Sequence, residues 1–432
     1  MTGPITGPLT GPLTGRDDAE RLDASSALSH TRDRFTIPDG VIYLDGNSLG
    51  ALPAGVPARL AQVVEREWGT GLITSWNPLA DGAGDWMQLS RRVARRIAPL
   101  IGVGADDVHL GDSTSVSLFK TMVAAARLRP DRRVLVVEPT TFPTDGYVAA
   151  GVADLLGLEL RWCDPADPLA AVDDDVALLA LTQVDFRTGA MFDLPAITAG
   201  AHARGALVQW DLCHSTGAVP VDLTGADADI AVGCTYKYLN GGPGSPAFTW
   251  VNPRLQGDLR QPITGWIGHA TPFAMARDYE PAPGIGQWAS GTPPVLALAA
   301  LEAALEAFEG VSPADLRAAS LSLTDLFIRL LDERCAERWP EVDLVTPREH
   351  ERRGSQVSFR HPHAYGVVQA LIARGVIGDY RDDGDAPGIA RFGFAPLYVR
   401  HVDVYDAVEH LEAVLAGEEH ADPAYSSRNA VT

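Results

Sequence analysis

Short apolar runs alternate with longer amphipathic segments through the middle of this chain. The runs are rich in Val, Leu and Ile and carry little polar alternation, which is typical of buried strands in a parallel sheet. They cover residues 134–138, 176–184, 206–210, 230–234 and 245–251. Because helical segments separate these strands, the pattern predicts an α/β fold, in which a three-layer large domain is built on a mainly parallel sheet.

The helical pattern continues towards the C-terminus and predicts a second, smaller α/β domain. Helices are predicted over residues 89–100, 111–128, 193–204, 295–308, 321–338, 365–374 and 404–415, a helix start near 17–29, and a further strand over 356–360. A repeat of Thr, Gly, Pro and a hydrophobic residue at the N-terminus cannot sustain either element. We therefore divide the chain into a disordered tail (1–20), an N-terminal segment (21–40), a large domain (41–293), a small domain (294–416) and a flexible tail (417–432).

Polar side chains follow two of the predicted strands. Asp211 and His214 come at the end of the run 206–210, and Tyr236 and Lys237 follow the run 230–234. In open α/β sheets, ligands bind beyond the carboxyl ends of the strands. The sequence therefore predicts that an acid and a lysine reach one site from two strand ends.

Lys237 is conspicuous because lysine is rare in this chain. Lys120 and Lys237 are the only lysines among 35 lysines and arginines. A buried lysine can become a neutral amine, which arginine cannot, and Schiff-base chemistry needs a neutral amine. The alternative is an ordinary charged residue at a loop edge. Its position near Asp211 favours the chemical role, because pyridoxal phosphate requires a lysine and an acid on its pyridine nitrogen.

Further residues match the needs of this cofactor, although each has a structural alternative. Ser113 and Thr114 open a helix and predict a phosphate site, or only a helix cap. Phe142 follows a strand and is placed to stack on a planar ring, or to pack in the core. Arg391 is suited to hold a carboxylate, or to form a surface ion pair.

Composition excludes several other classes of protein. The net charge of −21 and the pI near 4.8 argue against nucleic-acid binding. No apolar run reaches the roughly 18 residues of a membrane span, and no signal-peptide pattern is present, so the expected location is the cytoplasm. The four cysteines are scattered without metal-ligand spacing, so we expect no metal site.

Several motifs together resemble the kynureninase family, whose members are pyridoxal-phosphate enzymes of the aspartate aminotransferase fold (fold type I). The resemblance spans roughly residues 40 to 415 and rests on Y-L-D-G-N-S-L-G, F-P-T-D, D-L-C-H-S-T-G, Y-K-Y-L-N-G-G-P-G, G-W-I-G-H and R-F-G-F-A-P-L-Y. It implies hydrolysis of L-kynurenine, or of its 3-hydroxy form, to anthranilate or 3-hydroxyanthranilate and L-alanine. That reaction belongs to tryptophan catabolism.

The resemblance also implies roles for individual residues. Lys237 would form the internal aldimine with pyridoxal 5'-phosphate, Asp211 would pair with the pyridine nitrogen, and Tyr236 is a candidate acid. Arg391 would hold the substrate carboxylate. A homodimer with shared sites is implied. The remaining cofactor contacts would be Ser113, Thr114, Phe142, Asp145, Thr182, His214 and Tyr236 from one subunit, with Trp266 and Thr292 from its partner.

Two rival functions stay open at this point. Another enzyme of the same fold, such as a cysteine desulfurase or an aminotransferase, would share the cofactor; a desulfurase would need a reactive cysteine, whereas Cys213 and Cys234 lie in apolar strand-end contexts. A non-catalytic binding protein would not need Asp211, Lys237 and Arg391 together. Trp68, Trp76 and His269 are candidates for the wall of an aryl pocket, or for packing at a hinge.

Overall fold

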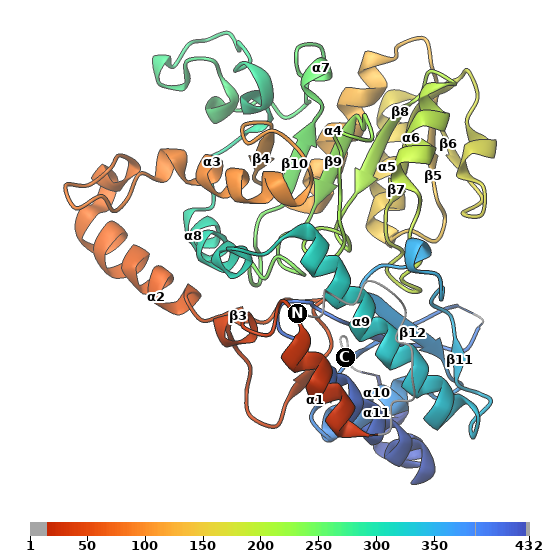
Figure 1. Ribbon diagram of the computed structural model, residues 1–432. Coiled ribbons are helices and arrows are strands. Elements are labelled where there is room, and N and C mark those ends of the chain that lie inside the picture. Colours follow the sequence, from red (N-terminus) through yellow and green to blue (C-terminus); the bar gives the residue numbers. More distant parts are fainter. Residues whose placement is uncertain (1–14, 385, 429–432) are drawn as a thin grey trace.

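The largest element of the computed structural model is a seven-stranded sheet with the order β4, β10, β9, β8, β7, β5, β6 (Figure 1). The structure describes residues 15–384 and 386–428. The five strands β6, β5, β7, β8 and β9 run parallel to one another. Strand β10 runs antiparallel to both β9 and β4. Their bounds are β4 Val108–Leu110, β5 Val134–Val137, β6 Glu159–Trp162, β7 Val176–Thr182, β8 Leu207–Asp211, β9 Ile230–Gly233 and β10 Phe248–Val251.

Helices cover both faces of this sheet and make three layers. Alternate residues of β5 separate the two cores, because Leu135 and Val137 pack with one group of helices and Val134 and Val136 with the other. One face carries α4 Thr114–Leu128 and α5 Pro143–Leu156, and the other carries α3 Trp86–Ile97, α6 Leu194–His202 and α8 Val295–Ala304. The predicted three-layer α/β fold with a mainly parallel sheet is confirmed.

A second, antiparallel sheet lies below the first in Figure 1, with the order β11, β12, β15, β14. Its strands are β11 Asp343–Leu344, β12 Gln356–Arg360, β14 Asp379–Arg381 and β15 Ile389–Gly393, and its helices are α9 Pro313–Leu331, α10 Ala364–Ala373 and α11 His401–Ala416. Helix α9 begins eight residues before the predicted start at 321, because Ser312 caps it and Pro313 occupies its first turn. The division of the chain at residue 294 stays a prediction.

The N-terminal helix α1 (Arg16–Ser25) packs against α11 of the C-terminal half. The Asp23 carboxylate accepts the backbone N–H of His401 at 2.6 Å, and Arg16 pairs with Asp406 at 2.8 Å. The last residues of the predicted tail are therefore helical. The repeat over residues 1–14 lies outside the described residues.

The turn after β2 (Ile42–Tyr43) joins the two halves of the molecule. Strand β2 pairs in parallel with β13 (Val376–Ile377) in the C-terminal half. A few residues later, Gly50 donates its N–H to the carbonyl of Tyr236 at 2.8 Å. A Cβ on Gly50 would lie 2.4 Å from the carbonyl oxygen of Lys237, so only glycine allows this approach. The turn thus lies directly against the segment that carries Lys237.

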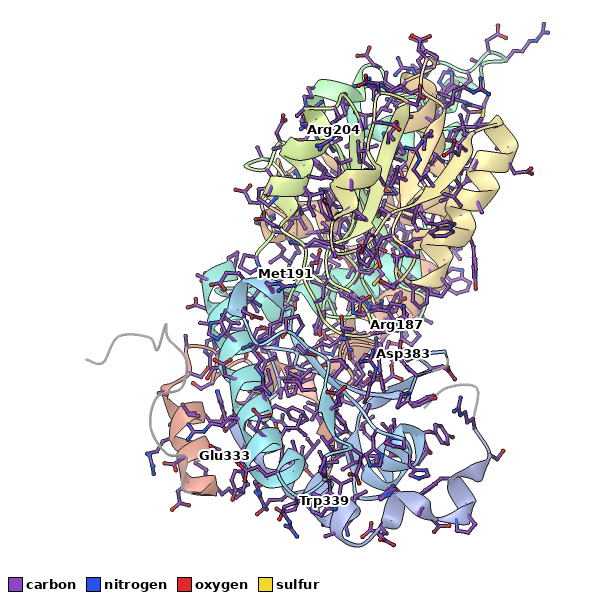
Figure 2. All side chains as sticks on the ribbon, turned by 90° about the vertical axis from the view of Figure 1, so that its right-hand side faces the viewer. Arg187, Met191, Arg204, Glu333, Trp339 and Asp383 are labelled. Atoms are coloured by element: carbon purple, nitrogen blue, oxygen red, sulfur yellow. The ribbon has the colours of Figure 1, made fainter. Side chains whose placement is uncertain are left out.

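A further connection joins the two halves at the level of Arg187 and Asp383 (Figure 2). Their side chains form an ion pair with 3.2 Å between Nη1 and Oδ1. Met191 donates its N–H to the carbonyl of Arg352 at 2.8 Å. Residues from the loop after β7 are therefore anchored to the second sheet.

The remaining segments lie outside the two main sheets. They are β1 Phe35–Thr36, β3 Leu52–Pro53, α2 Val56–Ala61 and α7 Pro253–Gln256, and helical turns continue α2 as far as Trp76. Strands β1 and β3 pair with each other in a small antiparallel sheet. Within the described ranges, no helix has the length and apolarity that a membrane crossing would need.

Candidate functional site

The candidate residues follow the carboxyl ends of four adjacent parallel strands, β5, β7, β8 and β9. They therefore lie along the same end of the large sheet. The pairing register aligns Thr182 on β7 with Asp211 on β8, and Asp211 with Val232 on β9. Both Thr182 and Asp211 are buried. This register brings the end of β8 next to the segment that follows β9, where Tyr236 and Lys237 lie. The predicted meeting of an acid and a lysine at strand ends is consistent with this arrangement.

Lys237 contacts His214 directly. The Lys237 Nζ lies 2.8 Å from His214 Nε2. Burial, and then the charge of Lys237, lower the pKa of His214 well below its ordinary value, so the imidazole is neutral and its Nε2 accepts from the lysine. The other ring nitrogen, Nδ1, is buried and has no hydrogen-bond partner among the described residues. Lys237 is half-buried and therefore accessible to a ligand.

Two aromatic rings lie beside the lysine. Its Nζ is 5.8 Å from the ring centroid of Phe142 and 5.7 Å from that of Tyr236. Phe142 is 45% exposed and contacts Phe186 edge-on at 5.3 Å, so one face of its ring is open to a planar ligand. Burial raises the pKa of Tyr236 above its ordinary value, and the neighbouring Cys234 adds to the shift. Tyr236 therefore keeps its proton at neutral pH.

Asp145 and Asp211 form a buried carboxyl pair. Burial, and then the charge of Asp211, raise the pKa of Asp145 well above its ordinary value. The Asp145 Oδ2 lies 3.2 Å from the hydroxyl of Thr182 and 3.3 Å from that of Thr141. Asp211 accepts the N–H of Cys213 at 2.6 Å. The raised pKa of Asp145 therefore favours its protonated form beside Asp211.

Helix α4 begins beside the end of β8. The Thr114 hydroxyl is 4.0 Å from the Cys213 thiol. The Ser113 hydroxyl accepts the N–H of Val116 at 3.4 Å and so acts as the N-cap. The Ser113 side chain is therefore engaged by the helix, and a bound phosphate would contact backbone N–H groups and Thr114 more readily than the Ser113 hydroxyl.

Arg391 lies on β15 and is almost completely buried, with 2% of its side chain exposed. It forms an ion pair with Asp379 of β14, which is equally buried. Its guanidinium also donates to the carbonyl of Phe186 at 2.7 Å and to the hydroxyl of Ser48 at 2.7 Å. The contact with Phe186 places Arg391 beside the aromatic pair of the lysine site. Arg391 is therefore a fixed interior cation, not a surface one.

Trp266 and Thr292 lie in the long segment between α7 and α8, apart from this cluster. Trp266 is 39% exposed and packs edge-on against Phe273 at 5.7 Å. Thr292 is exposed and lines a cavity of about 970 Å³ together with Ser113. None of Asp211, His214 and Lys237 lines that cavity. The single chain does not bring Trp266 and Thr292 to its own lysine, so their role stays a prediction.

The aromatic candidates for the aryl pocket are dispersed. Trp76 packs edge-on against Trp86 at 5.6 Å, and Trp86 donates to the fully buried Glu67 at 2.6 Å. Trp68 is 57% exposed. His269 is buried in its own loop and accepts the N–H of Thr271 at 2.9 Å. For Trp76 the packing role is the one the structure supports.

Sequence reasoning missed four residues that surround Arg391: Asp45, Ser48, Asp379 and Arg381. The segment Gly-Asp-Tyr-Arg over residues 378–381 offered a signal, because its acid and arginine alternate as on one face of a strand. The strand that this segment faces could not be read from that signal.

Among the described residues, no group of three or more metal-ligating side chains is placed to hold an ion.

The cysteines at the strand ends are unsuited to nucleophilic chemistry. Cys213 and Cys234 are both buried, and Cys213 accepts the N–H of Cys234 at 3.1 Å. The interaction with Cys234, together with burial, raises the pKa of the Cys213 thiol well above its ordinary value. A reactive thiol requires the opposite shift. The raised pKa of Cys213 and the burial of both thiols argue against a desulfurase that would use either cysteine.

Comparison with known proteins adds sequence relatives over nearly the whole chain. The family model described as the kynureninase C-terminal domain matches residues 316–411. A protein named kynureninase from Burkholderia mallei (strain SAVP1) is 51% identical over 424 residues, which are 96% of this chain and 99% of the relative. The kynureninase of Pseudomonas fluorescens is 50% identical with the same coverage.

Solved structures with the same fold are more distant in sequence. An apo cysteine desulfurase from Thermococcus onnurineus NA1 matches with a TM-score of 0.74 at 18% identity, covering 90% of this chain and 98% of its own. A mutant of C-DES with glycine covalently linked to its PLP cofactor matches with a TM-score of 0.72 at 17% identity, covering 89% and 98%. At this level of identity the structures show a shared fold and no shared substrate.

Proposed function

The chain belongs to the kynureninase family, and from this premise we propose that it is a hydrolase that cleaves the β–γ carbon–carbon bond of L-kynurenine. The products would be anthranilate and L-alanine. The observation that carries the proposal is the meeting of Lys237, its acceptor His214 and the buried pair Asp145–Asp211 at one sheet edge, with Arg391 facing the same site. The alternative, another enzyme of the same fold, is less supported, because relatives at 50% and 51% identity over 96% of the chain are named kynureninase.

The residues of the site fit pyridoxal phosphate. A half-buried lysine with a neutral acceptor, a buried acid that accepts a backbone N–H, an open aromatic face and a helix N-terminus are the groups that this cofactor requires. When bound, the cofactor supplies an electron sink for the electrons left at the substrate's α-carbon. Lys237 would hold it covalently, and Asp211 would keep its pyridine nitrogen protonated.

Each side chain then has a distinct task in the reaction. The neutral amine of Lys237 would remove and return the proton at the α-carbon, and His214 Nε2 would accept from that amine and orient it. Tyr236, which keeps its proton, would act as an acid. Arg391 would hold the substrate carboxylate with the α-hydrogen in reach of Lys237, and Phe142 would stack on the ring of the cofactor.

We also propose that the site is completed in a homodimer in the cytoplasm. Trp266 and Thr292 are exposed, and a cavity of about 970 Å³ lies between Thr292 and the start of α4. Trp266, Phe273 and Met275 together expose a large apolar surface in this segment. A second copy that covers this surface would bring its Thr292 to the phosphate site, which supports the expected partner contribution.

The function is tested by product analysis with purified enzyme loaded with pyridoxal phosphate. L-Kynurenine and 3-hydroxy-L-kynurenine are supplied separately, anthranilate or 3-hydroxyanthranilate is followed by fluorescence, and alanine is quantified in parallel. Equal amounts of both products support the proposal, and the two kcat/KM values decide the preferred substrate. Release of sulfide from cysteine or formation of a keto acid, without kynurenine cleavage, would show that the chain is one of the rival enzymes.

A further inference from the structure

Arg391 belongs to a cluster of four ionisable side chains, three of which lie on one face of the second sheet and the fourth, Asp45, in the turn after β2. The register of β14 and β15 places Asp379 opposite Arg391, and Arg381 opposite Ile389. Because side chains two residues apart share a face, Asp379, Arg381 and Arg391 all point to the same side. Asp379 forms ion pairs with both arginines, at 2.6 Å for Arg381. Asp45 lies close enough to interact with Asp379 and with both arginines.

The donors of Arg391 are almost all engaged within the protein. A guanidinium has five N–H groups. The Nη2 donates to Ser48 and to Asp379, and Nη1 donates once, to the carbonyl of Phe186. When the Asn47 amide presents its oxygen, Nε donates to it at 3.2 Å. One N–H remains, whereas a two-point grip on a carboxylate needs two.

Arg381 has the donors that Arg391 lacks. Its Nε is buried and has no hydrogen-bond partner among the described residues. Its Nη2 pairs with Asp379 and makes a long contact of 3.5 Å with the Ser48 hydroxyl, and its Nη1 makes only a long contact of 3.4 Å with the carbonyl of Tyr380. Its side chain is 34% exposed, so it borders open space, whereas Arg391 is 2% exposed. Arg381 therefore forms the accessible end of the cluster, and its buried Nε is an additional donor without a partner among the described residues.

Arg381 also lies within electrostatic reach of the lysine site. The charges that lower the pKa of His214, after burial itself, are those of Lys237, Arg391 and Arg381 in that order. Contacts place Arg391 on this side, because its guanidinium donates to the carbonyl of Phe186, and the Phe186 ring packs on Phe142 beside Lys237. Asp379 joins Arg381 to Arg391. A substrate whose amine reaches Lys237 and whose carboxylate reaches Arg391 would thus direct that carboxylate toward the arginine pair.

We propose that Arg381 is a second binding residue for the substrate carboxylate, held in place by Asp379 and acting together with Arg391. This inference rests on the proposed function, because it assigns the binding of the carboxylate of the same substrate.

The balance of charges within the cluster supports the proposal. Burial, and then Asp379, raise the pKa of Asp45 to about 7, and Tyr43 and Tyr238, which also lie near Asp45, are neutral. When Asp45 carries a proton, Arg381 and Arg391 share the charge of Asp379, so a substrate carboxylate would balance the second arginine.

The test compares Arg381→Gln and Arg381→Lys with the matched control Arg360→Gln. Arg360 is also opposite Ile389, on β12, its side chain is 33% exposed, and it is paired with Asp383 at 2.7 Å. Each holoenzyme is assayed with L-kynurenine and with its α-carboxamide. Arg381→Gln should lower kcat/KM for the acid about 10- to 100-fold, chiefly through KM, which is the range for a lost hydrogen bond to a charged group. It should leave the amide within about threefold.

The outcomes are distinct. Arg381→Lys should recover part of the preference for the acid, and Arg360→Gln should behave as wild type. An equal loss for acid and amide with Arg381→Gln would overturn the proposal, since it would indicate a structural role, and so would no loss at all. Circular dichroism and thermal unfolding identify any variant that is misfolded; if Arg381→Gln fails to fold, the acid-to-amide ratio of Arg381→Lys decides in the same way.

A binding measurement separates this inference from the proposed reaction. L-Alanine and L-alaninamide are titrated into the holoenzyme, and the change in cofactor absorbance gives both Kd values. Arg381→Gln should reduce the preference for alanine over its amide by about tenfold or more. If kynurenine is not cleaved but this preference still depends on Arg381, the proposed function fails and the inference stands. If kynurenine is cleaved and the preference is unchanged, the inference fails alone.

Discussion

The Nζ of Lys237 lies 2.8 Å from Nε2 of His214, and the histidine is neutral because it is buried among positive charges. A neutral imidazole accepts a hydrogen bond, so His214 directs the lysine amine without competing for a substrate proton. This relationship joins residues 23 positions apart, one after β8 and one after β9.

The first prediction concerns the identity of the reactive lysine. Reduction of the holoenzyme with borohydride should fix the cofactor on Lys237, and Lys237→Arg should abolish turnover because arginine stays charged. Peptide mapping by mass spectrometry locates the label. Lys120 is the internal control, because it is buried and paired with Asp112 and the carbonyl of Trp288. A label on Lys120 would contradict the assignment.

The second prediction concerns His214. Replacement with Phe removes the acceptor of Lys237 while it retains a buried ring of similar size. We expect kcat to fall by about 10- to 100-fold with a smaller change in KM, since the orientation of the amine matters for proton transfer more than for binding. Steady-state kinetics measure both constants. His202→Phe is the control, because His202 pairs with Asp229 away from the site and should leave kcat unchanged. A wild-type kcat for His214→Phe would disprove the role.

The third prediction concerns Tyr236 and the basic limb of the pH–rate profile. Burial raises the pKa of Tyr236 above its ordinary value of 10.0, so the hydroxyl does not ionise in the assay range below pH 10. Tyr236→Phe should lower kcat by about 10-fold or more if the hydroxyl is an acid. It should leave the midpoint of the basic limb in place. Profiles of kcat and kcat/KM from pH 6 to 10 provide the measurement, and disappearance of the basic limb would show that Tyr236 does titrate.

The fourth prediction concerns stability and Glu138, which is 2% exposed at the end of β5. Burial, and then Asp185, raise the pKa of Glu138 from 4.5 to about 7. Between these values the folded protein binds a proton that the unfolded chain has released, so stability falls as pH rises from about 4.5 through about 7, by up to about 3 kcal/mol.

Glu138→Gln should remove this loss. The free energy of unfolding of the variant should therefore increase relative to that of the wild type as pH rises. Denaturant titrations at pH 5 and pH 8 measure the free energy of unfolding of both proteins. The exposed Glu306→Gln is the control, and its difference from wild type should not change with pH. A constant difference for Glu138→Gln as well would show that Glu138 is ionised in the folded protein.

The fifth prediction concerns assembly. If Thr292 serves the partner's site, a mixture of Lys237→Ala and Thr292→Ala subunits should recover activity, because each heterodimer then has one intact site. After random exchange between equal amounts of the two variants, half of the dimers are heterodimers, each with one of two sites intact. Recovery should therefore approach about a quarter of wild-type activity. Mixing Lys237→Ala with the double variant Lys237→Ala/Thr292→Ala provides a control that should stay inactive. A fully active monomer in sedimentation analysis would rule out the shared site.

Local sequence patterns were sufficient for the strands and for the residues at their ends. The apolar runs that became β5, β7, β8 and β9 can be recognised because both faces of a central parallel strand are buried. Asp211 and Lys237 could be placed near each other because parallel strands carry their carboxyl ends to one edge. Their chemistry followed from residue type, since only lysine among the cations can serve as a neutral amine.

Tertiary structure alone decided which groups surround those residues. The pairing of Arg391 with Asp379 depends on the register between β14 and β15, and the contact with Ser48 depends on a turn more than 300 residues away. No local pattern encodes such a distance, because the energy that fixes it comes from packing the two halves together. The pairing within the second sheet also brings Arg381 to Asp379, beside Arg391. The sequence by itself thus determined what chemistry the chain can perform, and the fold decided where the substrate is held.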